Sequence, residues 1–224
     1  MECNTNLMNL KDPFIFFPLL IIINIIAYGL NISFSKIWDR IYSHHTSISK
    51  KEILLSLLIL VLNIAVAFPG FILWSNEIIV FSNDNFWLSF IGLFLLIDFL
   101  MYVSHWVSHN ISYLRKIHSK HHEHSIKFNC VSLYYMSPWE SVLFGLLLTT
   151  VTILFSFNLY SFISFLLFNW FYGVITHLNV SKSKPHFFIF TTNTFHHNHH
   201  QLNGVNYGFY TFLWDRIFKT EMKH

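Results

Sequence analysis

The chain has 224 residues, of which 54% are hydrophobic, 19% are aromatic and only 11% are charged, with a formal net charge of +3 at pH 7 and a mean hydropathy of +0.47. Soluble domains carry about a quarter charged residues, so this composition excludes an ordinary soluble protein and indicates an integral membrane protein. The two cysteines, Cys3 and Cys130, are too few and too far apart for a disulfide framework or a thiolate metal site.

Three apolar stretches are each long enough to cross a bilayer, which takes about 20 helical residues. They are Pro13–Ile32, Ile53–Trp74 and Phe86–Val107. The first lacks a strongly basic start and a small-residue cleavage site, so we predict a retained helix rather than a signal peptide. A fourth stretch, Val142–Thr176, is too long for one straight span and short for two. It is predicted to form a hairpin of two short helices that breaks at Ser156–Asn158.

The basic residues predict which side of the membrane each loop faces. Thirteen of the fourteen Lys and Arg residues follow the first span, the third span or the hairpin, and Lys11 is the exception. The loop between the second and third spans carries Glu77 and Asp84 but no Lys or Arg. The positive-inside rule therefore makes the thirteen residues cytoplasmic, beside lipid headgroups, and we find no reason to infer nucleic-acid binding.

Eight of the fifteen histidines fall into three short clusters on that predicted cytoplasmic side. They are His105 and His109; His118, His121 and His122; and His196, His199 and His200. Spacings of three and four residues place the imidazoles of a helical segment on one face. Neutral imidazoles that converge from several helices hold transition metals. Because one zinc ion needs only three or four ligands, this number favours two metal ions.

Asp98 and Tyr102 continue the stripe of His105 and His109 along the third span. An aspartate inside a membrane helix is costly and marks function by default. We expect Asp98 to accept a hydrogen bond from a ligating imidazole; the alternative is a polar partner on a neighbouring helix. His177, at the end of the hairpin, lies at the right depth to join the site, although a lone histidine there is more often a cap or surface residue.

The remaining histidines are expected to lie outside the metal site. His124 is predicted to be solvated, and His197 is predicted to point away toward a hydrogen bond or water. No role is assigned to His44, His45 or His224, and His186 is only weakly placed, after Pro185. The sequence Trp-Asp-Arg-Ile occurs at residues 38–41 and 214–217, and we interpret this as a coincidence because nothing around it repeats.

In order and spacing, the motifs resemble the fatty acid hydroxylase and sterol desaturase superfamily of membrane di-iron oxygenases over roughly residues 90–220. They are the Asp-Tyr-His-His stripe at 98–109, H-x-x-H-H at 118–122 with Phe-Asn at 128–129, Ser-Pro-Trp-Glu at 137–140, Thr-His-Leu-Asn at 176–179, His-His-Asn-His-His at 196–200, Asn-Tyr-Gly at 206–208 and Trp-Asp-Arg-Ile-Phe-Lys-Thr at 214–220. Because Thr-His-Leu-Asn is similar to the family's isolated His-x-Asn, the resemblance implies that His177 is a ninth ligand.

The resemblance implies two Fe ions, O2 as co-substrate, a lipid substrate in the bilayer and electrons from a separate cytochrome b5- or ferredoxin-like protein. The chain itself has no flavin, haem, iron–sulfur or G-x-G-x-x-G motif. Three departures weaken any transfer of substrate class. Trp106 replaces an arginine, Ser137 replaces the histidine of His-Pro-x-Glu, and Lys219 replaces a glycine. The replacement at Ser137 leaves two possibilities open. Either this chain has one metal ligand fewer than the family, or the family's histidine at this position only supports a ligand.

The sequence therefore predicts an all-α integral membrane protein with three transmembrane helices, a short helical hairpin and a cytoplasmic histidine-rich cap that holds the metal site. Residues 1–85 are predicted to form N-terminal transmembrane helices, and residues 86–224 a fatty acid hydroxylase-like catalytic domain. The leading hypothesis for function is an iron-dependent lipid hydroxylase or desaturase.

Two alternatives stay open. One is a membrane metal-binding or metal-transport protein, which would favour ionisable groups deep within several spans. Asp98 is the only such residue deep in the three main spans, and this favours the enzyme. The other is a family member that keeps its metal but has lost activity, an alternative that Ser137 raises.

Overall fold

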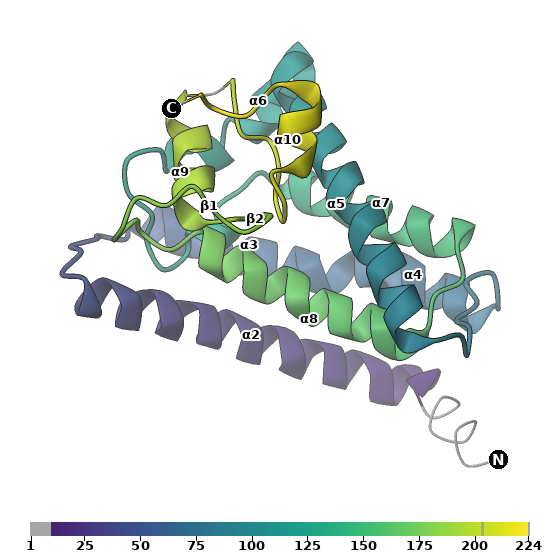
Figure 1. Cartoon of the computed structure of the whole chain (residues 1–224). Helices are drawn as coiled ribbons and strands as arrows, with labels where there is room; N and C mark the ends of the chain where they lie inside the picture. The colour runs from purple at the N-terminus through teal and green to yellow at the C-terminus, as the bar shows by residue number, and fades with distance from the viewer. Residues whose placement is uncertain (1–9, 203, 224) are drawn as a thin grey trace.

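The computed structural model describes residues 10–202 and 204–223, and most of them are helical (Figure 1). The helices are α2 (Pro13–Ile41), α3 (Lys50–Ala65), α4 (Ala67–Ser75), α5 (Phe86–Asn110), α6 (Ser112–His118), α7 (Pro138–Leu154), α8 (Leu159–Thr176), α9 (Asn193–Leu202) and α10 (Leu213–Phe218). Two short 3-10 helices, η1 (His121–Glu123) and η2 (Ser132–Tyr134), lie between α6 and α7. Strands β1 (His186–Phe187) and β2 (Phe190–Thr191) form one antiparallel hairpin.

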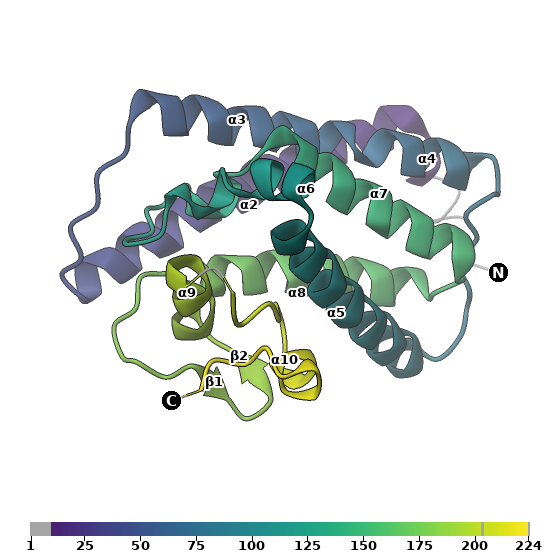
Figure 2. The ribbon, with the colours of Figure 1, turned by 90° about the horizontal axis from the view of Figure 1, so that it is seen from above.

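The long apolar helices form a base, and the short elements form a cap on it. In Figure 1, the axes of α2, α8 and the α3–α4 pair are roughly aligned, and α5 rises from this layer at a steep angle. The cap consists of α6, α9, the β-hairpin and α10 (Figures 1 and 2). Four helical segments are long and apolar enough to cross a membrane: α2, α3 with α4, α5 and α8. These segments fit a multi-pass membrane protein.

Helix α2 turns one stripe of polar residues inward and many of its large apolar residues outward, as expected of a helix that faces lipid. Asn31, Ser35 and Asp39 recur every four residues and are buried. The amide of Asn31 donates to the carbonyl oxygen of Cys130 at 2.9 Å. Large apolar side chains of the same helix, such as Ile25, are more than half exposed. The helix continues to Ile41, beyond the apolar window that ends at Ile32.

The helical hairpin predicted at Val142–Thr176 is confirmed. Helix α7 ends at Leu154 and α8 begins at Leu159, so the break includes Ser156–Asn158 as expected. Asn158 caps α8, because its side-chain oxygen accepts from two backbone N–H groups of the first turn. Its amide also donates to the carbonyl oxygen of Asp84 at 3.1 Å. The hairpin turn therefore lies against the loop between α4 and α5, at the end of the bundle away from the histidines.

Candidate metal centre

All nine histidines singled out in the sequence converge in the cap, although they come from five elements. The elements are α5, α6, η1, the end of α8, and α9. The histidines form two groups, and within each group the candidate ligand atoms lie within 4.8 Å of one another. The first histidine group consists of His105, His109, His118, His122 and His199. The second histidine group consists of His121, His177, His196 and His200.

Each H-x-x-H-H motif gives two histidines to one group and its middle histidine to the other group. The outer residues of the first motif, His118 and His122, belong to the first group, and its middle histidine belongs to the second. In the other motif, His196 and His200 belong to the second group, and the middle histidine, His199, belongs to the first. Neighbouring residues on a helix point about 100° apart, so the adjacent pair of each motif divides between two sites. The prediction that each cluster shares one face is therefore wrong for these middle histidines.

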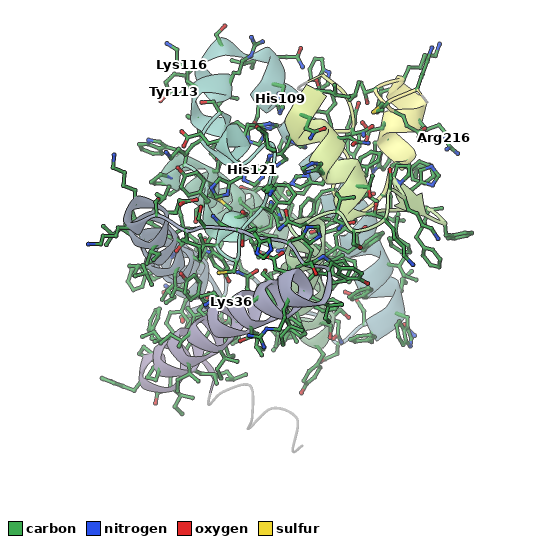
Figure 3. All side chains as sticks on the ribbon, turned by 90° about the vertical axis from the view of Figure 1, so that its left-hand side faces the viewer. Lys36, His109, Tyr113, Lys116, His121 and Arg216 are labelled. Atoms are coloured by element: carbon green, nitrogen blue, oxygen red, sulfur yellow. The ribbon has the colours of Figure 1, made fainter. Side chains whose placement is uncertain are left out.

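Within each group the Nε2 atoms face one another. In the first group the Nε2 atoms of His105 and His118 are 3.1 Å apart, and in the second those of His196 and His200 are 3.0 Å apart. The other neighbouring Nε2 pairs lie 3.0 to 3.3 Å apart. Two of the side chains, His109 and His121, can be followed in Figure 3, where they lie inside the cap while Lys116 and Tyr113 lie at its outer edge.

Backbone carbonyl groups fix the tautomer of three of these imidazoles. The Nδ1 atoms donate at 2.7 to 2.8 Å in three pairs: His105 to Tyr207, His177 to Gly173 and His199 to Val205. Since a carbonyl oxygen can only accept, Nδ1 carries the proton and Nε2 keeps its lone pair. These lone pairs point at other ring nitrogens, and facing lone pairs repel unless a cation lies between them. The arrangement therefore fits bound metal ions.

Glu140 fixes a fourth imidazole. Its Oε1 lies 2.6 Å from the Nδ1 of His118, and its Oε2 accepts from the backbone N–H of Ser137 at 3.1 Å. A carboxylate behind a ligating histidine holds the ring in place and raises its basicity. Ser137 is the N-cap of α7 and contributes no ligand atom to either group.

Burial keeps the imidazoles neutral. Desolvation lowers the pKa of His122 and of His177 to about 4. Burial also lowers the pKa of His196 and of His199 well below the usual value for histidine. The neutral imidazole is the form that binds a metal. At neutral pH these ligands therefore need not release protons before they bind.

Asp215 holds the loop that supports His105. Its carboxylate accepts from the backbone N–H groups of Tyr207 at 2.7 Å and of Gly208 at 2.6 Å. A Cβ atom on Gly208 would collide with the carbonyl oxygen of Thr211, so this position requires glycine. The Asn-Tyr-Gly and Trp-Asp-Arg motifs thus form one structure that presents the Tyr207 carbonyl to His105.

Asp98 does not hydrogen-bond to a histidine of either group, and the expectation that it would is wrong. Its carboxylate accepts from the backbone N–H of Thr211 at 3.1 Å, from the hydroxyl of the same residue at 2.6 Å, and from the Nε1 of Trp214 at 3.0 Å. The hydroxyl of Tyr102 lies 3.0 Å from that of Thr220. Both residues therefore fasten the C-terminal segment to α5, behind the histidines.

Asn179, the last residue of the His-x-Asn motif, connects the second group to α2. Its side chain exchanges two hydrogen bonds with the backbone of Phe128 and donates to Asp39 at 2.9 Å. The ring of Phe128 packs against His177 and His200, with centroids 5.5 and 5.1 Å apart. The packing around the second group therefore depends on a carboxylate near the end of α2.

Both copies of Trp-Asp-Arg-Ile hold the cap, although nothing around them repeats. In the first copy, Trp38 donates to the carbonyl oxygen of Asn179 at 2.8 Å, and Asp39 accepts from the amide of the same residue. In the second copy, Trp214 and Asp215 make the contacts described above. Each copy therefore anchors a segment of the site.

His124 is not solvated, contrary to the prediction. Its Nε2 lies 2.7 Å from Glu52, its Nδ1 lies 2.7 Å from the hydroxyl of Ser132, and its ring stacks on Tyr135 with centroids 4.2 Å apart. Glu52 also accepts from the amide of Asn129 at 2.8 Å. This network ties the segment after η1 to the start of α3.

The other excluded histidines lie in neither group. His197 points away from the site and lies beside Gln201, as predicted. His44, His45 and His186 are also absent from both groups, and His224 lies outside the described residues.

Sequence reasoning missed two supporting glutamates, although both carry a recognisable signal. Glu140 and Glu52 each occupy the last position of a Ser-x-x-Glu capping box at a helix start. Each uses one carboxylate oxygen for the cap and the other for a histidine, His118 or His124. A capping box beside a histidine cluster can therefore point to a glutamate that also orients an imidazole.

Comparison with known proteins identifies one similarity. A family model described as fatty acid hydroxylase matches residues 90–220, which is more than half of the chain. No curated protein and no solved structure matches the chain. The matched range holds all nine histidines and Glu140, whereas Asp39 and Glu52 precede it.

Proposed function

The chain belongs to the fatty acid hydroxylase family, and from this premise we propose that it is a membrane di-iron oxygenase that hydroxylates or desaturates a lipid. The observation that carries the proposal is the pair of adjacent groups with five and four histidines. Imidazole donors suit iron, copper and zinc alike, and insertion of oxygen into a C–H bond requires a redox metal. The coarser activity, that of a lipid hydroxylase-type oxidoreductase, follows from the family itself.

The metal ions would be held by the first and second histidine groups, and when bound they would supply the activation of O2. The chain's own residues perform the remaining tasks. Burial keeps the imidazoles neutral, and the carbonyl of Tyr207 and the carboxylate of Glu140 orient the rings of His105 and His118. The lipid substrate reaches the site from the bilayer that surrounds the apolar helices.

We place the cap and the C-terminus on the cytoplasmic side, where an electron donor can reach them. The support is the distribution of charge: thirteen of fourteen basic residues lie outside the N-terminal tail and the loop between α4 and α5. Electrons would come from a separate cytochrome b5- or ferredoxin-like protein, since the chain has no motif for an electron-carrying cofactor.

A metal transporter is the weaker alternative. Such a protein needs ionisable groups along a path through the membrane. Here the histidines gather at one end, and the carboxylate of Asp98 is occupied by Thr211 and Trp214. A family member that binds metal without activity is the remaining alternative, and the functional test separates it from the enzyme.

Lipid analysis of cells that express the protein tests the function. The control is the His121→Ala variant, which removes a ligand of the second group. We expect the wild type alone to produce a lipid that has gained one oxygen atom or lost two hydrogen atoms. Protein purified under reducing, low-oxygen conditions should contain close to two iron atoms per chain. One iron atom, or zinc alone after growth in iron-replete medium, would refute the di-iron assignment.

Cysteine labelling in intact cells tests the orientation. A cysteine at Asn83, in the loop between α4 and α5, should react with an impermeant reagent from outside. Cysteines at Ser125 and Lys223 should react only after permeabilisation. External labelling at Lys223 would contradict a cytoplasmic cap.

A further inference from the structure

The tip of the β-hairpin is the most exposed aromatic feature of the cap. Phe187 and Phe188 are 78% and 79% exposed, and Ile189 is 41% exposed. Three consecutive large apolar side chains at a turn are unfavourable in water, where the exposed apolar surface stays hydrated. The hairpin lies beside α8 and α10, on the side of the molecule away from α3 (Figure 2).

The backbone at this tip is strained. Phe188 is the first of the two residues that connect β1 to β2, and its φ is 58°. Glycine is the usual residue at a hairpin position with positive φ, because a bulky side chain there costs free energy. The chain thus holds a phenylalanine outward at a position that favours glycine, and residues kept in such conformations cluster at functional sites.

Phe190, which pairs with Phe187 across the hairpin, packs on the membrane helices. Phe190 lines an apolar groove of about 140 Å³ together with Phe90, Ile91 and Phe94 of α5 and Phe168 of α8. Phe168 lies at the middle of α8, and the three α5 residues lie in the half of that helix farther from the histidines. The hairpin is therefore continuous with the surface that these helices present to lipid hydrocarbon.

The charges next to the hairpin match a membrane interface. Lys182 and Lys184 are exposed in the segment that leads from α8 to β1, and the tip itself carries no charge. Glu221 at the base lies 3.9 Å from His186 and is paired with Arg216. Lysines next to an apolar tip are typical of segments that insert into the headgroup and acyl boundary.

We propose that the β1–β2 hairpin is a membrane-inserted wedge, whose tip residues Phe187, Phe188 and Ile189 lie in the hydrocarbon of the bilayer that the helices cross. The strained turn holds the two aromatic rings in lipid, and the groove at Phe190 receives one hydrocarbon chain between α5, α8 and the hairpin. The proposal needs only the membrane helices, so it holds whichever metal the histidines bind.

Spin-label accessibility in lipid nanodiscs tests the proposal. The label is attached to the full-length Phe188→Cys variant, with Cys3→Ala and Cys130→Ala to remove other thiols. The matched control is Tyr113→Cys on α6, because Tyr113 is also an exposed aromatic residue, 69% exposed, but lies at the outer edge of the cap (Figure 3). Collisions of the label with O2, which concentrates in hydrocarbon, are compared with collisions with a water-soluble nickel chelate.

We expect the ratio of O2 to nickel collisions to be several-fold higher at residue 188 than at residue 113. Metal content like that of the wild type identifies a folded variant. If Phe188→Cys fails that check, Ile189→Cys takes its place at the same tip. Equal ratios at the tip and at residue 113 would overturn the proposal and leave the tip as a surface for a soluble protein partner.

Discussion

The two histidine groups have similar ligands but different support. In the first group, Nδ1 atoms are held in three of five histidines, by two carbonyl groups and by Glu140. In the second group one of four, His177, is held in this way. Among the nine ligands, a buried Nδ1 atom without a hydrogen-bond partner among residues 10–202 and 204–223 occurs in His121 and His200 of the second group and in His122 of the first. The rings of the second group are therefore positioned mainly by packing.

The support of the two groups also comes from different parts of the chain. Tyr207, Val205 and Glu140 lie within the range that matches the family. The second group relies on Phe128 and Asn179, and through Asn179 on Asp39 in α2, which precedes the range. Because fixed ligand orientation raises metal affinity, the second group should bind its metal more weakly and depend more on α2.

The loss of one histidine ligand should have the largest effect on metal content and activity. The amount of metal lost should differ between the two groups. His177→Ala leaves three histidines in the second group, whereas His109→Ala leaves four in the first. We expect His177→Ala to lose one metal ion per chain and all activity. His109→Ala should lose activity but retain more of its metal. Elemental analysis and lipid analysis of both variants measure these effects.

His44→Ala is the control for both variants, because His44 lies in neither group. It should change neither metal content nor activity. If His109→Ala lost more metal than His177→Ala, the proposed order of affinity between the groups would be wrong.

Replacing the carboxyl group of Glu140 should weaken the first group selectively. Glu140→Gln keeps the shape of the side chain but loses the carboxylate that orients His118. Loss of such a partner lowers metal affinity by about 10- to 100-fold. Competition with a chelator should release the metal of the first group earlier than in the wild type.

Glu123→Gln is the matched control, since Glu123 contacts Lys120 and Tyr135 but no histidine of either group. Equal release from both variants would contradict a specific role for Glu140.

The sequence was informative where local spacing decides the structure. Residues four apart share a helix face, so His105 with His109, and His196 with His200, were expected to face the same way, and each pair lies in one group. Hydropathy likewise located the long apolar helices and the break between α7 and α8. Both features depend on neighbouring residues alone.

Contacts between distant residues were not predictable in this way. Asp98 and Thr211 are 113 residues apart, and Asn179 and Asp39 are 140 residues apart. No local period relates such residues, because the packing of whole elements brings them together. For the same reason, sequence spacing could not assign the middle histidine of each H-x-x-H-H motif to the opposite group.

A smaller effect is expected at Asp39. Asp39→Asn weakens the hydrogen bond to Asn179 and, through Phe128, the packing of the second group. Since Asp39 does not itself contact a histidine of this group, we expect affinity to fall by about tenfold at most. Chelator competition should show faster release from the second group only. The neighbouring change Arg40→Gln is the control, and release from the first group instead would contradict the connection to α2.

The smallest effect on the metal is expected at Glu52, whose loss should act on stability. Glu52→Gln removes a charged partner of His124 and Asn129, at a cost of about 1.5–3 kcal/mol. For a chain of this size about 1 kcal/mol shifts Tm by roughly 2–4 °C, so thermal unfolding in detergent should move by several degrees. Metal content should stay at the wild-type value. In a His124→Ala background the same change should cost clearly less, because the partner is already gone. Full additivity of the two changes would show that the pair does not act as a unit.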